Sequence, residues 1–131
     1  MHKTSEHDFE IFKEECIYHL REYGFGDFSF FFEHKNQKEL GQINAWELGD
    51  HNDKNIVLAL TKNWDSEPTE YEIRRFAFHE VNEALLDKLC LLAEKRFGVT
   101  TDDIEETRHG IIARLQYHFF DQSLKERGLS P

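Results

Sequence analysis

The chain has 131 residues, 39% of them hydrophobic, and a formal net charge of −10. This length predicts a single domain, residues 1–131, that can bury a core without disulfide support. The acidic balance argues against a protein that binds nucleic-acid phosphates, and the longest apolar runs, Phe28–Phe32 and Ile56–Leu60, are far shorter than the ~20 residues of a membrane-spanning helix.

The N-terminal segment and the cysteines bear on the cellular compartment. Met1–Asp8 lacks the apolar centre of a secretory signal. Cys16 and Cys90 stand in separate segments and indicate no disulfide framework. We therefore expect a protein of the reducing cytoplasm.

The first half of the chain predicts one helix followed by three strands. Apolar residues recur every three or four positions from about Ser5 to Tyr23, which is typical of an amphipathic helix. Alternate phenylalanines of Phe28–His34 share one side of a strand. Two further strands, Leu40–Leu48 and Asn55–Thr61, flank a polar loop and are expected to form a hairpin.

The second half predicts two helices. Ser66-Glu67-Pro68 has a capping residue and a first-turn proline, and neither proline nor glycine interrupts the sequence from there to Arg96. A last helix runs from Thr100 to about Gln122, and the tail Lys125–Pro131 is expected to fray. This order predicts an α+β domain with a small antiparallel or mixed sheet and helices on one face.

The long helix carries an H-E-x-x-E motif. At 100° per residue, His79 and Glu83 project from one face a turn apart, positioned to hold the same ion. The layout is that of H-E-x-x-H, in which two ligands hold zinc and the intervening glutamate, here Glu80, is the general base. A carboxylate replaces the second imidazole. The plain alternative is a buried His79 hydrogen-bonded to Glu83 within the helix.

Two segments carry a resemblance to a known family. They are Arg74–Leu86, with H-E-V-N-E-A-L-L, and Arg96–Leu115, with E-T-R-H-G-I-I-A-R-L. In these residues the chain resembles small phage and prophage proteins related to minimal zinc metallopeptidases. The resemblance implies a zincin-like core, a zinc ion held by His79, Glu83 and His109, Glu80 as base, and the cytoplasm of a bacterial host. Glu83 departs from the histidine of well-characterised peptidases.

The residues alone leave the third ligand open between His109 and His118. In a straight antiparallel helix pair, Glu83 would lie ~21 Å above the turn and His109 only ~12 Å, so that His118 is nearer in depth. The two histidines face opposite ways, and only one can reach the ion. The resemblance favours His109, and a steep helix crossing or an end of the long helix near Leu91 would remove the mismatch. We expect His109.

Three functions fit these patterns. The first is a zinc-dependent metallopeptidase-like hydrolase in which Glu80 transfers the proton and Asn55–Thr61, as an edge strand, aligns an extended peptide or protein substrate. The second is a catalytically inactive, acidic, phage-encoded protein that binds a host protein. The third places iron(II) in the same two-histidine, one-carboxylate set.

Overall fold

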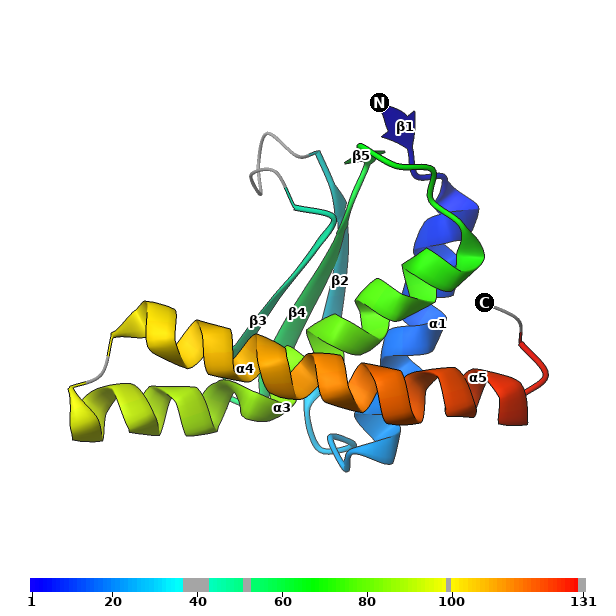
Figure 1. Cartoon of the computed structure of the whole chain (residues 1–131). Helices are drawn as coiled ribbons and strands as arrows, with labels where there is room; N and C mark the ends of the chain where they lie inside the picture. Colours follow the sequence, from blue (N-terminus) through cyan, green and yellow to red (C-terminus); the bar gives the residue numbers. More distant parts are fainter. Residues whose placement is uncertain (37–42, 51–52, 99, 130–131) are drawn as a thin grey trace.

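The computed structural model has an α+β architecture and describes residues 1–36, 43–50, 53–98 and 100–129 (Figure 1). The larger of its two sheets has the strand order β2-β4-β3, and the smaller one pairs β1 with β5. The strands are β1 (His2–Lys3), β2 (Ser29–Lys35), β3 (Ala45–Asp50), β4 (Asn55–Thr61) and β5 (Asn63–Trp64). The small sheet was not expected from the sequence.

The larger sheet is mixed, because β2 runs parallel to β4 while β3 runs antiparallel to it. The predicted hairpin is confirmed in its pairing; β3 begins at Ala45, and residues 40–42 of the predicted strand lie outside the described residues. The prediction that Asn55–Thr61 forms an edge is wrong, since β4 lies between β2 and β3. Its apolar run fills the centre of the sheet, and β3, which carries Glu47, is an edge strand.

Helices make up most of the remaining chain: α1 (Glu6–Glu22), α3 (Glu70–Phe97), α4 (Thr101–Leu115), the π-helix η1 (Gln116–Phe120) and α5 (Asp121–Glu126). Ser5, near which the helix was expected to begin, caps α1 by accepting a hydrogen bond from the Asp8 N–H. The cap of α3 is Thr69 and not Ser66, because the Thr69 hydroxyl accepts from the Glu72 N–H. None of the described helices combines the length and the apolar character needed to cross a membrane.

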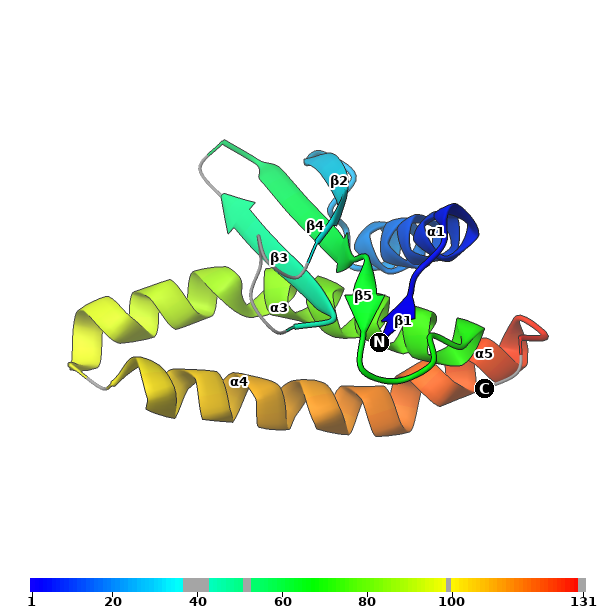
Figure 2. The ribbon, with the colours of Figure 1, turned by 90° about the horizontal axis from the view of Figure 1, so that it is seen from above.

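The core lies between the larger sheet and two helices, α1 and α3 (Figure 2). Alternate residues of β4 enter it, and Trp64 of β5 is fully buried beside them. The helices contribute apolar residues at three- and four-residue spacing: Ile11, Phe12, Cys16 and Leu20 from α1, and Ile73, Ala77, Val81 and Ala84 from α3. This packing fixes the rotation of α3 and directs His79 and Glu83 away from this core.

The C-terminal helical structure extends farther, and is more buried, than the sequence predicts. Helical structure continues past Gln122 to Glu126, Leu124 is fully buried, and Leu129 packs on the same small cluster. The expected fraying of Lys125–Pro131 is therefore wrong as far as Leu129; residues 130–131 lie outside the described residues.

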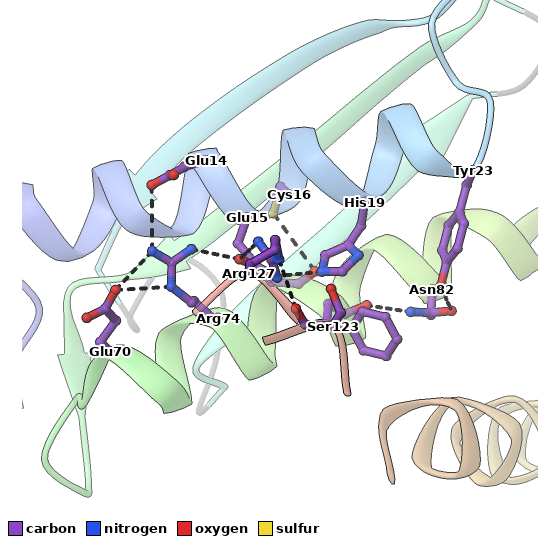
Figure 3. A network of polar contacts seen from close by, with 12 residues as sticks. Glu14, Glu15, Cys16, His19, Tyr23, Glu70, Arg74, Asn82, Ser123 and Arg127 are labelled. Carbon is purple, nitrogen blue, oxygen red and sulfur yellow. Dashed lines mark hydrogen bonds and ion pairs between the residues drawn. The ribbon is translucent and has the colours of Figure 1, made fainter. Parts of the chain in front are cut away.

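A buried ion cluster ties this segment to the body of the protein (Figure 3). The Glu15 cluster, as we call it, consists of Glu15, His19, Arg74 and Arg127. The fully buried Glu15 carboxylate accepts from His19 Nε2 at 2.6 Å, Arg74 Nη1 at 2.7 Å and Arg127 Nη2 at 2.7 Å. Burial raises the pKa of Glu15, but these three partners outweigh it and lower the pKa to about 2.

Candidate metal centre

Helices α3 and α4 bring His79, Glu83 and His109 together. One potential ligand atom from each residue lies within 4.8 Å of those of the other two. His109 Nε2 is 2.9 Å from Glu83 Oε1, His79 Nε2 is 3.9 Å from Glu83 Oε2, and the two imidazole rings meet edge to face. The three residues expected to hold an ion are thus neighbours.

The depth argument against His109 fails because α3 is not straight. Helix α3 runs unbroken to Phe97, so an early end near Leu91 is not the explanation. Figure 2 shows α3 bowing away from α4, so the two helices do not form the straight pair that the depth argument assumed. The side chain of His118 lies outside what the structure describes.

Burial sets the ionisation of the α3 residues. It lowers the pKa of His79, despite the opposing effect of Glu83, and so favours the neutral imidazole that a metal requires. Burial, followed by the charge of Glu83, raises the pKa of Glu80 well above its usual range. Glu80 is 4% exposed and hydrogen-bonded to Glu83, so its protonated form is favoured when no cation is present.

A cleft of about 540 Å³ opens onto these residues. Its lining includes His79, Glu80 and Glu83 of α3, together with residues of α4 and of edge strand β3: Glu105, Arg108, His109, Ala45, Trp46 and Glu47. Trp46 therefore lines a cleft, whereas Trp64 belongs to the core.

The sequence analysis did not identify Arg108 as a member of this site. Its guanidinium lies 3.0 Å from Glu83 Oε1 and 3.0 Å from Asp87 Oδ1, and it also pairs with Glu105 at 2.7 Å. It therefore neutralises and orients the Glu83 carboxylate that His109 also contacts. One signal was available. Arg108 is adjacent to His109, and its two partners on α3, Glu83 and Asp87, lie four residues apart and therefore share a face of that helix.

Glu47 was also missed. Its carboxyl group is hydrogen-bonded to Asp87, and burial, followed by this contact, raises the pKa of Glu47 to about 11. The contact with Asp87 could not be predicted from the sequence, because only the register of β3 within the sheet decides that Glu47 points toward α3.

Unmet hydrogen-bonding capacity is concentrated in the cleft. In the described part of the chain, four buried side-chain atoms have no partner, and three of them belong to cleft residues: Glu47 Oε2, Glu80 Oε2 and Arg108 Nε. Buried polar groups in folded proteins are nearly always paired with protein or water. Together with two imidazoles and a carboxylate, a donor set suited to a divalent transition metal, these atoms fit a hydrated ion.

Comparisons with known proteins do not assign the chain to a family: no family model, no curated protein and no solved structure matches it.

Proposed function

We propose that the protein is a metal-dependent hydrolase of zincin-like architecture, with a single zinc ion held by His79, Glu83 and His109. The observation that carries this proposal is the convergence of the three side chains from two helices within 4.8 Å. Two histidines and one glutamate are an established catalytic zinc set with a fourth position left for water or substrate. Iron(II) uses the same ligand types, so the metal is tested as well.

The protein side chains have separate tasks in this proposal. A zinc ion held here would lower the pKa of a water molecule and polarise a substrate carbonyl. Glu80 takes the proton of the attacking water on its carboxylate and returns it to the leaving nitrogen of an amide. Its Oε2 is buried, lines the cleft and has no partner among the described residues, so it is available for this transfer.

The charge of an ion also accounts for the ionisation that Glu80 needs. Burial and Glu83 hold its pKa high while only protein groups surround it. A neighbouring cation favours the ionised carboxylate. Arg108, through its contact with Glu83 Oε1, keeps that ligand directed at the two histidines.

Edge strand β3 replaces β4 as the strand that aligns a substrate. Its residues Ala45, Trp46 and Glu47 line the cleft, and in the described part of the chain β4 is its only strand partner. An extended peptide can add to the other side through backbone hydrogen bonds.

The first experiment is elemental analysis of untagged protein beside the variants His79→Ala, Glu83→Ala and His109→Ala, with His7→Ala, an exposed histidine of α1, as the matched control. We expect near-stoichiometric zinc in the wild type and in the control, and loss of zinc in the three site variants. A metal-free wild type that takes up neither zinc nor iron(II) on titration would overturn the proposal.

The second experiment separates a hydrolase from an inactive binding protein. Glu80→Gln should keep the metal and the fold but lose turnover of a peptide library, whereas exposed Glu22→Gln should retain it. A zinc-loaded wild type without turnover would favour the acidic interaction protein.

A further inference from the structure

The cleft extends beyond the candidate metal centre along β3. A second cavity of about 260 Å³ lies between β3, α3 and α4, and Glu47, Glu105 and Arg108 line both cavities. The second cavity therefore continues the cleft along the free edge of β3, on the side of Glu47 away from the two histidines.

The walls of this second cavity are acidic. Among its described lining residues, four carry carboxyl groups and one is cationic: Glu47, Asp87, Glu94, Glu105 and Arg108. Arg108 is already engaged by Glu83, Asp87 and Glu105. Among its described lining residues, the cavity therefore carries more carboxyl groups than cationic groups.

Two buried carboxyl oxygens face the cleft without a partner in the described part of the chain. Glu80 is 4% exposed, and its Oε2 accepts no hydrogen bond. Glu47 Oε2, on the β3 side of the cleft, likewise has no hydrogen-bond partner among the described residues. Unpaired acceptors in an acidic, partly enclosed space are best satisfied by a donor that carries positive charge.

The geometry of strand pairing indicates where a positively charged donor of a bound peptide would lie. When a peptide adds to an edge strand, the residue directly opposite a given position points to the same face of the sheet, with Cβ atoms about 4.5–5.5 Å apart. Glu47 points toward Asp87 of α3, to which it is hydrogen-bonded. The side chain opposite Glu47 in an added strand would therefore enter the same acidic space.

We propose that Glu47 is a specificity-determining residue, which receives the ammonium or guanidinium group of a lysine or arginine in an extended peptide paired with the free edge of β3. This inference rests on the proposed function for its catalytic meaning, since it names basic peptides as the substrate class. A second copy of this chain is a poor occupant because each copy carries a net charge of −10.

The test is peptide binding to the metal-free wild-type protein in EDTA, where no hydrolysis occurs. The probes are fluorescent, blocked hexapeptides of threonine and valine in which one residue, scanned along the peptide, is lysine or norleucine. We expect lysine at one position to bind at least about tenfold more tightly than norleucine, because the ammonium group favours the ionised Glu47 carboxylate. Glu47→Gln, which cannot ionise, should bring that ratio close to one, and Glu94→Gln, at another carboxyl group of the second cavity, should lower the ratio by a smaller factor.

The matched control is Glu33→Gln, which alters a half-exposed glutamate of β2, the other edge strand, and should leave the ratio unchanged. Absence of peptide binding, absence of a lysine preference, or a preference that survives Glu47→Gln would each overturn the inference. Peptide hydrolysis by the zinc-loaded protein without a basic preference would overturn it while leaving the proposed function intact. Glu47-dependent binding without hydrolysis would support it and count against the proposed function.

Discussion

His109 Nε2 and Glu83 Oε1 lie 2.9 Å apart, although the two residues are separated by 26 positions and belong to different helices. The contact joins α4 to the H-E-x-x-E turn of α3. It turns a pair of side chains on one helix, an arrangement common on helix surfaces, into a three-residue set with two imidazoles and a carboxylate.

The strength of metal binding should depend on this contact. His109→Ala removes one of three proposed ligands, and even the loss of a supporting residue around a metal costs about 10- to 100-fold in affinity. We expect the zinc affinity, measured by competition with a chelator, to fall by more than about 100-fold. Unchanged affinity in a folded His109→Ala protein would exclude His109 as a ligand.

Arg108 should have two opposing effects on the metal: it orients Glu83, and its positive charge repels a cation. We expect the charge to dominate the metal affinity, while Arg108 stabilises the metal-free protein. Arg108→Gln removes a positive charge beside Glu83 and should raise zinc affinity by a few-fold to tenfold, the size of a partly screened charge interaction. The same change leaves Glu83 and Asp87 without their cation, and the metal-free variant should unfold at a lower denaturant concentration. Equal or weaker zinc affinity in the variant would show that Arg108 acts chiefly by orienting Glu83.

The Glu15 cluster should dominate the stability of the C-terminal segment. Glu15→Gln leaves Arg74, His19 and Arg127 without their shared carboxylate, and breaking a buried ion pair on one side costs about 3–5 kcal/mol. Chemical denaturation should show a loss of this size. The neighbouring Glu14→Gln, at a glutamate whose side chain is 71% exposed, should change stability by less than about 1 kcal/mol.

The same cluster predicts how stability depends on acid. The pKa of Glu15 is about 2 in the folded protein against 4.5 ordinarily, so the stability that it contributes is present above about pH 4.5 and is lost as the pH falls toward 2. The shift corresponds to about 3 kcal/mol. The difference in unfolding free energy between the wild type and Glu15→Gln should shrink over this range, and a difference that stays constant would contradict the assignment.

Glu47 predicts the opposite dependence in the metal-free protein. Its pKa is raised to about 11, so the folded state holds a proton that the unfolded state releases above about pH 4.5. Stability should therefore decrease as the pH rises from about 5 toward 9, by at most about 1.4 kcal/mol per pH unit. Glu47→Gln, which mimics the protonated carboxyl group, should flatten this decrease. An unaltered pH profile in the variant would show that Glu47 is ionised in the folded protein.

Local patterns fixed much of the secondary structure. The three- and four-residue spacing of apolar side chains set the position of α1, and the apolar run Asn55–Thr61 matched β4 at both ends. The H-E-x-x-E spacing placed His79 and Glu83 on one turn, because side chains four residues apart on a helix necessarily share a face. These features depend only on the geometry of a single element.

Only the tertiary structure decided which elements meet. The position of β4 at the centre, the contact of Glu83 with His109, and the ion pair of Arg127 with Glu15 all depend on contacts between distant segments. Arg108 and Glu47 could not be predicted as site residues for the same reason. A charged residue in a sequence is expected to be exposed to solvent, and only the elements that pack around it decide whether it is buried. The sequence determined the candidate ligands; packing decided which of them lie together and which acidic groups surround them.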